Sequence, residues 1–83
     1  MQPLIDAITK WLKRTANHRD VTADTELIGL GILDSIEILN LVSFLEERFG
    51  ITLPIEEFVP ENFATPRAIA DLVVRLSPAA SAA

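Results

Sequence analysis

The chain has 83 residues, of which 49% are hydrophobic, a net charge of −5 and no cysteine. A domain of this size buries only about 60% of the surface that its unfolded chain exposes, so we expect one compact core. The lack of cysteine excludes disulfides and thiolate metal sites. The sequence has no apolar run near the length of a membrane span and no basic-then-apolar start, so we expect a cytoplasmic monomer without membrane span or signal peptide.

The charges are unevenly distributed along the chain. Four of the seven basic residues lie in the first 19 positions, whereas ten of the twelve acidic residues lie between positions 20 and 64. This acidic field should repel nucleic acid and anionic lipid and attract basic surfaces of partner proteins. The alternative is that the acidic residues serve only solubility.

A first amphipathic helix is expected from Pro3 to about Asn17. Its apolar positions share one face at helical spacing, namely Leu4, Ile5, Ile8, Trp11 and Leu12. The single histidine, His18, follows this helix and has no second metal ligand in the local pattern, so we assign it no metal or catalytic role.

Residues 20–34 form the least regular segment and are nevertheless rich in apolar side chains. We expect a compact loop that lies across the helices, because a connection of this length in a small domain either carries function or packs. Its apolar residues are Val21, Leu27, Ile28, Leu30, Ile32 and Leu33.

The clearest helix begins at Ser35 and ends at Gly50, a residue typical of helix C-termini. Asp34 is suited to cap it, and Glu37, three residues later, completes the acidic version of a capping box. Ser35 would then be the first helical residue, with its hydroxyl free and directed at solvent beside the positive end of the helix dipole. The expected core stripe is Ile38, Leu39, Val42, Leu45 and Phe49.

Three apolar residues of this helix lie off that stripe. We expect Leu41 and Phe44 to be buried because the helix is central, and Ile36 to be an exposed docking contact beside the serine. Glu37, Glu46 and Glu47 would surround Ile36 with negative charge. The alternative for Ile36 is burial on a second side of the helix, as expected for Leu41 and Phe44.

The remaining chain completes a helical pattern. An extended connection over 51–54 and a turn over 55–58 should lead to a one-turn helix over 60–64, which begins on Pro60. A last helix should begin at Thr65–Pro66 and stop at Ser77–Pro78. The sequence therefore predicts an all-α protein, a small four-helix bundle with three long helices and one short one, over residues 1–77, followed by a disordered tail over 78–83.

The residues around Ser35 do not indicate catalysis. A serine nucleophile of the strand-to-helix type has glycine two residues away on either side, whereas Leu33 and Glu37 occupy those positions here. The paired acidic residues at 46–47 and 56–57 are adjacent in sequence, so on a helix they diverge and form no acid–base dyad. We therefore expect a protein that is not an enzyme.

The stretch Gly31-Ile32-Leu33-Asp34-Ser35-Ile36-Glu37 resembles the phosphopantetheine attachment motif of acyl and peptidyl carrier proteins. The similarity extends over about residues 4–76 and includes two further segments, Phe44-Leu45-Glu46-Glu47-Arg48-Phe49-Gly50-Ile51 and Pro60-Glu61-Asn62-Phe63-Ala64-Thr65-Pro66. Those motifs in that order make the resemblance specific.

The resemblance implies that Ser35 accepts 4′-phosphopantetheine from coenzyme A through a separate phosphopantetheinyl transferase. Cargo would be held as a thioester, loaded by a ligase, adenylation enzyme or acyltransferase and passed to a downstream synthase or modifying enzyme. Asp34, Ile36 and Glu37 correspond to positions that partners read, and Glu46 and Glu47 are candidate salt-bridge contacts.

The spacing Gly-x-x-Asp-Ser and the segment Pro54-Ile55-Glu56-Glu57-Phe58 are similar to D-alanyl carriers and to discrete carriers of polyketide and nonribosomal pathways. We therefore expect a free-standing acyl or aminoacyl carrier of a specialised pathway. The alternative function is a non-catalytic helical adaptor that uses Ile36 and the acidic second helix as a docking patch.

Overall fold

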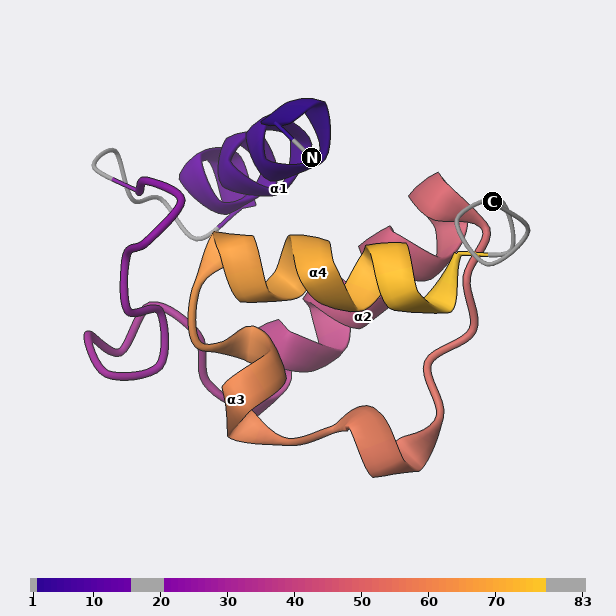
Figure 1. Cartoon of the computed structure of the whole chain (residues 1–83). Helices are drawn as coiled ribbons and strands as arrows, with labels where there is room; N and C mark the ends of the chain where they lie inside the picture. The colour runs from indigo at the N-terminus through magenta and orange to yellow at the C-terminus, as the bar shows by residue number, and fades with distance from the viewer. Residues whose placement is uncertain (1, 16–20, 78–83) are drawn as a thin grey trace.

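The computed structural model describes residues 2–15 and 21–77, and those residues contain helices and irregular segments but no strand. The helices are α1 (Gln2–Thr15), α2 (Ser35–Phe49), α3 (Pro60–Phe63) and α4 (Pro66–Leu76), with a 3₁₀ turn at Ile55–Glu57 (Figure 1). The predicted bundle of three long helices and one short one is confirmed. The expected helix end at Asn17, His18 and the tail over 78–83 lie outside the described residues.

Apolar side chains from every helix and from the long loop form one core, and none of the buried residues in the described part is polar or charged. Helix α4 packs against both α1 and α3, and Figure 1 shows α2 crossing behind α4. No described helix is both long and apolar enough to cross a bilayer. The fully buried core residues with the largest side chains are Phe63, Ile8, Leu12, Leu27, Leu41, Leu45, Ile69 and Leu72.

The loop between α1 and α2 packs as predicted through most of its apolar residues. Val21, Leu27, Ile32 and Leu33 are buried. Leu30 differs, because its side chain is 68% exposed on a turn closed by hydrogen bonds from Leu30 N to Glu26 O and from Gly31 N to Ile28 O. The loop is therefore anchored on both sides of an exposed turn.

Backbone hydrogen bonds tie this loop to the second half of the chain. Leu27 N donates to Ala64 O at 2.7 Å, and Arg67 N donates to Ala23 O at 2.9 Å. The Arg67 guanidinium also makes two hydrogen bonds with the Asp24 carboxylate, at 2.9 and 3.1 Å. This contact lowers the pKa of Asp24, chiefly through the hydrogen bond from Arg67. The loop that leads into α2 is thus held from the start of α4.

The core face predicted for helix α2 is confirmed except at Leu39, and the burial expected of Leu41 is confirmed as well. Leu41, Val42 and Leu45 are its buried residues, whereas Leu39, which was placed on the core stripe, is 59% exposed. Positions 39 and 41 lie about 200° apart on a helix, so they cannot both face one core. Phe44, three residues after Leu41, is half-buried and stacks on Trp11 of α1, with ring centroids 5.6 Å apart.

A network of side chains supports the segment between α2 and α3. Asn62 Nδ2 donates to the backbone oxygen and to Oε1 of Glu57, at 2.8 and 2.9 Å. Arg75 of α4 donates to Glu57 Oε1 at 3.3 Å and to Asn62 Oδ1 at 3.1 Å. At the other end of the segment, Leu53 N donates to Glu46 Oε2 at 3.0 Å. These bonds hold an irregular stretch in one position beside the start of α2.

Candidate functional site

Ser35 is exposed at the first turn of α2, and its hydroxyl is not the capping group. Asp34 has extended backbone geometry, and its Oδ1 accepts a hydrogen bond from Glu37 N at 2.8 Å. Gly31, with a φ of 74° that favours glycine, reverses the chain just before this point. The helix end is therefore closed by the residue before the serine, as predicted, and the Ser35 hydroxyl stays free.

The second half of the predicted capping box does not form. Glu37 is half-buried, and its Oε2 is buried without a hydrogen-bond partner in the described part of the chain. An exposed cap needs no return bond, because water can solvate the Asp34 N–H. The prediction of a reciprocal pair between Asp34 and Glu37 was wrong in this respect.

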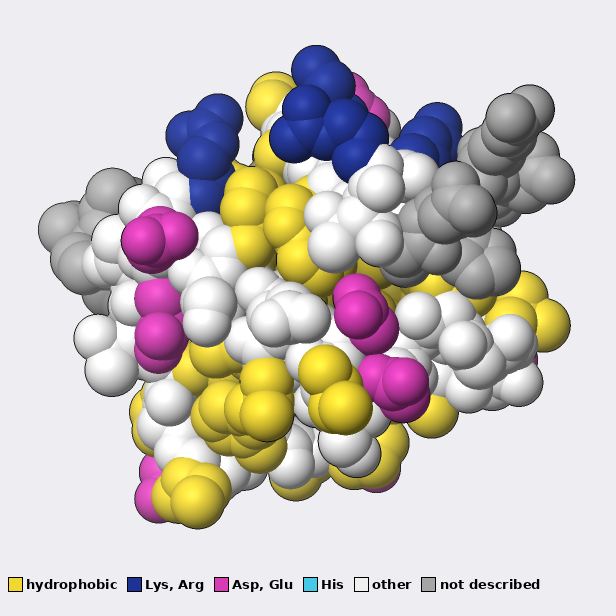
Figure 2. Space-filling model, turned by 180° about the vertical axis from the view of Figure 1, so that it is seen from behind, with side chains coloured by type: hydrophobic (Ala, Val, Ile, Leu, Met, Phe, Trp, Pro, Cys, Tyr) yellow, Lys and Arg dark blue, Asp and Glu magenta, His cyan; other side chains and the backbone are white. Residues whose placement is uncertain are grey.

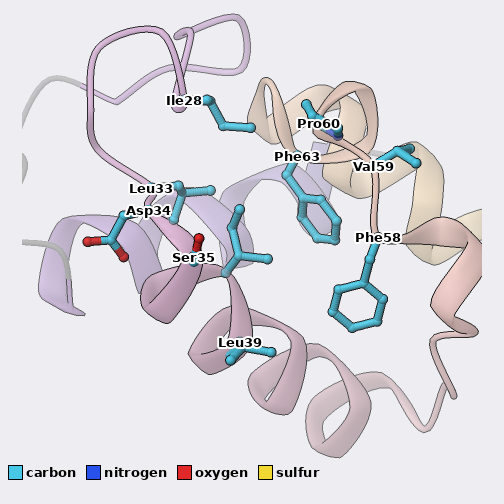
Figure 3. A pocket seen from close by; sticks show the side chains of 10 residues that line it. Ile28, Leu33, Asp34, Ser35, Leu39, Phe58, Val59, Pro60 and Phe63 are labelled. Atoms are coloured by element: carbon cyan, nitrogen blue, oxygen red, sulfur yellow. The ribbon is translucent and has the colours of Figure 1, made fainter.

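Ser35 stands at the edge of an apolar groove of about 520 Å³. Figure 3 shows the Phe58 and Phe63 side chains across the groove from Ser35, while the Asp34 carboxylate is directed away from both rings. Apart from Asp34 and Ser35, every side chain in the lining is apolar: Ile28, Leu33, Ile38, Leu39, Phe58, Val59, Pro60 and Phe63. A group attached to the serine would begin between an acidic cap and an apolar wall.

The five residues singled out for partner docking have different surroundings. Asp34, Ile36 and Glu47 are exposed, with Ile36 at 69%. Glu46 and Glu37 are both half-buried, and Glu46 Oε2 accepts a hydrogen bond from Leu53 N. The freely accessible part of the set is therefore Asp34, Ile36 and Glu47.

The sequence interpretation gave no site role to the apolar groove residues, although Leu33 lies within the attachment motif. Leu39 was assigned to the core, although it lies four residues after Ser35 and so shares a helix face with it. Phe58 and Val59 lie just before the short helix, and they are 38% and 37% exposed. The signal for Leu39 was present in the helical spacing, whereas the approach of 58–63 to Ser35 depends on tertiary contacts.

The described residues contain no group of three histidine, cysteine or acidic side chains that could hold a metal ion. They place an accessible hydroxyl, that of Ser35, at the capped start of α2 next to an apolar groove. Fold and site together define a small helical domain of the carrier type.

The match to a family model is specific and covers most of the chain. Residues 2–73 match the family described as "Phosphopantetheine attachment site". The chain belongs to this family, and it is a biosynthetic carrier protein that uses phosphopantetheine and acts together with enzymes.

Curated relatives are similar in sequence over different shares of their length. "Aminoacyl carrier protein 1" of Bradyrhizobium diazoefficiens is 32% identical over 80 residues, which are 95% of this chain and 88% of that protein. A "D-alanyl carrier protein" of Streptococcus suis is 42% identical over 53 residues, 64% of this chain and 67% of that protein. "Lincomycin biosynthesis protein LmbN" of Streptomyces lincolnensis is 35% identical over 71 residues, and the match spans 86% of this chain but only 26% of that protein.

A solved structure shares the fold. A chain in the structure titled "Crystal structure of FAD-dependent dehydrogenase" superposes with a TM-score of 0.76 at 27% identity and covers 81% of this chain and 99% of that chain. The all-helical architecture of the carrier is thereby found in an independently solved molecule.

Proposed function

We propose that Ser35 Oγ is the atom that carries the phosphopantetheine. The observation that supports this most strongly is the cap, because Asp34 Oδ1 takes the Glu37 N–H and leaves the neighbouring hydroxyl unused. The helix N-terminus also carries partial positive charge, which stabilises a phosphodiester there. Ser35 is exposed, so a transferase can reach it.

The bound group supplies the thiol that this cysteine-free chain lacks, on a flexible arm that can hold cargo as a thioester. The chain's own residues fix the origin of that arm. Asp34 holds the helix end, Gly31 sets the approach of the loop, and Leu39 with Phe58 provides an apolar wall beside the attachment point. In this proposal the protein itself performs no catalysis.

The cargo in this proposal is an acyl or aminoacyl group of a specialised biosynthetic pathway. Relatives named for D-alanyl and aminoacyl transfer and for lincomycin biosynthesis support this class. The partners would be a phosphopantetheinyl transferase, a loading ligase, adenylation enzyme or acyltransferase, and a downstream synthase or modifying enzyme, all in the cytoplasm.

The modification is tested by intact mass after incubation with coenzyme A and a broad-specificity phosphopantetheinyl transferase. We expect one phosphopantetheine on the wild type, none on Ser35→Ala, and full modification of Ser43→Ala, which removes an exposed serine of the same helix. A wild-type chain that stays unmodified would favour the adaptor alternative. An adduct that persists on Ser35→Ala would place the attachment elsewhere.

Partner docking is proposed at Asp34, Ile36, Glu37, Glu46 and Glu47, with Ile36 as the exposed apolar anchor. Truncation of an interface anchor costs more than about 1 kcal/mol, so Ile36→Ala should slow loading by the transferase about five- to tenfold. Val74→Ala, at a 40% exposed apolar position on α4, is the matched control. Equal loading rates for both variants would remove Ile36 from the docking surface.

A further inference from the structure

A second groove, lined by positive charge, lies between α1 and α2. It has a volume of about 210 Å³, and its lining residues are Ala7, Lys10, Trp11, Arg14, Phe44 and Arg48. Three of the six are cationic and none is acidic, in a protein whose net charge is −5. Figure 2 shows Lys and Arg side chains gathered at the top of the molecule, on the side of α1 in Figure 1.

The groove follows from helical spacing on two neighbouring helices. Ala7, Lys10, Trp11 and Arg14 recur at three- and four-residue intervals, so they form one row on α1. Phe44 and Arg48 lie four residues apart on α2. The Trp11–Phe44 stack joins the two rows and separates this groove from the core below.

One cation of the groove, Arg48, is restrained by an aromatic ring, and none of the three is paired with a carboxylate in the described part of the chain. Arg48 lies over the Phe49 ring, with its guanidinium carbon 5.4 Å from the ring centroid, and Phe49 packs edge-on against Phe44. Neither Lys10, Arg14 nor Arg48 forms a salt bridge within the described residues. An arginine restrained by an aromatic ring loses less side-chain freedom when it binds a carboxylate.

We propose that this groove binds an acidic segment of a partner protein. A guanidinium group can bind a carboxylate with two parallel hydrogen bonds, and this groove presents two such groups, Arg14 and Arg48. The small volume suits one or two side chains, and the strongly acidic remainder of the surface repels an extended polyanion such as nucleic acid. The groove thus selects a short carboxylate-bearing stretch of polypeptide.

The position of the groove separates this contact from the site at Ser35. Arg48 is thirteen residues after Ser35 on the same helix, roughly 20 Å along its axis at about 1.5 Å per residue. An enzyme held at the groove could keep the carrier close while the Ser35 end enters an active site, which raises the effective concentration of the cargo. That use in transfer rests on the proposed function, whereas the binding itself does not require modified Ser35.

The test uses the unmodified full chain, so its result does not depend on Ser35. Trp11 is the only tryptophan and lines the groove, and its fluorescence therefore reports binding directly. Titration with a hexaglutamate peptide at low ionic strength should give a saturable change, weakened by salt, and hexaglutamine should give none. Arg14→Ala should weaken hexaglutamate binding about three- to fivefold, the upper part of the range for one exposed ion pair.

The matched control is Lys13→Ala, which removes one positive charge from the neighbouring position of α1 but lies outside the groove. It should change the affinity less than about 1.5-fold, and the circular dichroism of both variants should equal that of the wild type. If Arg14→Ala and Lys13→Ala weakened hexaglutamate binding equally, the binding would reflect only general charge attraction, and the proposal would be overturned. Absence of peptide binding would also overturn it, as would saturable binding to phosphatidylglycerol vesicles that hexaglutamate does not displace.

Discussion

The carboxylate of Glu46 supports the backbone that follows α2, and its removal should destabilise the protein. Glu46 Oε2 accepts the hydrogen bond of Leu53 N at 3.0 Å, in a partly buried position. Leu53 is only 8% exposed and Ile51 only 5%, so the chain here is packed on the core and has little freedom to turn its N–H toward water. Glu46→Ala leaves this donor without its partner.

The expected loss follows from the kind of hydrogen bond that is removed. A bond to a charged group contributes about 1.5–3 kcal/mol, and the half-exposed side chain of Glu46 brings the value to the lower part of that range. We expect Glu46→Ala to lower the free energy of unfolding by about 1–2 kcal/mol. For a domain of this size, each kcal/mol lowers the Tm by roughly 4–8 °C.

Glu47→Ala is the matched control, because it removes the same side chain from the next position of α2, where the residue is exposed. Chemical denaturation followed by circular dichroism should place this variant within about 0.5 kcal/mol of the wild type. Glu46→Gln keeps a carbonyl oxygen as acceptor, so its free energy of unfolding should lie between those of Glu46→Ala and Glu47→Ala. Equal stability of Glu46→Ala and Glu47→Ala would show that the hydrogen bond from Leu53 N to Glu46 does not stabilise the protein.

Three further predictions concern the helix ends and the loop. Asp34→Ala should lower the unfolding free energy by about 1 kcal/mol in urea denaturation, whereas Ser35→Ala should leave it nearly unchanged; the reverse order would make Ser35 the cap. Gly50→Ala should cost about 1 kcal/mol by the same measurement, because Gly50 has a φ of 66° and no neighbour that a methyl group would touch. The pKa of Asp24 is lowered below its ordinary value of 3.8 by the hydrogen bond from Arg67, so its contribution to stability is present above pH 3.8 and disappears as the pH falls through the folded-state pKa. Denaturation between pH 5 and pH 2 should therefore show a smaller acid-induced loss for Asp24→Asn than for the wild type.

The helices and their ends were predictable because their signals are local. Asp34, Gly50 and Thr65 act at the helix termini as the sequence indicated, and Pro60 and Pro66 begin the last two helices. Each of these residues acts on backbone groups within four positions of itself. No knowledge of the rest of the fold is needed to recognise such a signal.

The orientation of α2 was not predictable in the same way. Leu39 and Leu41 are both leucines at helical spacing from other apolar residues, and the tertiary packing that buries Leu41 leaves Leu39 59% exposed. From the sequence alone Glu46 is likewise expected to be a surface carboxylate. Its hydrogen bond with Leu53 N depends on how the chain folds back after Gly50. Ser35 itself was located correctly as the first helical residue, whereas the apolar wall opposite it comes from residues 58–63, which are more than twenty positions away.

The hydrogen bonds between the long loop and the start of α4 also bear on when the region around Ser35 reaches its folded structure during synthesis. Arg67 forms a hydrogen bond with Asp24 across 43 positions of the sequence. The hydrogen bond from Leu27 N to Ala64 O likewise joins distant parts of the chain. Contacts of such long range form late in folding, and a ribosome delivers residue 67 well after residue 35. The loop that leads into α2 therefore reaches its final position only after residue 67 has been made, and the attachment site matures later than the synthesis of Ser35 itself.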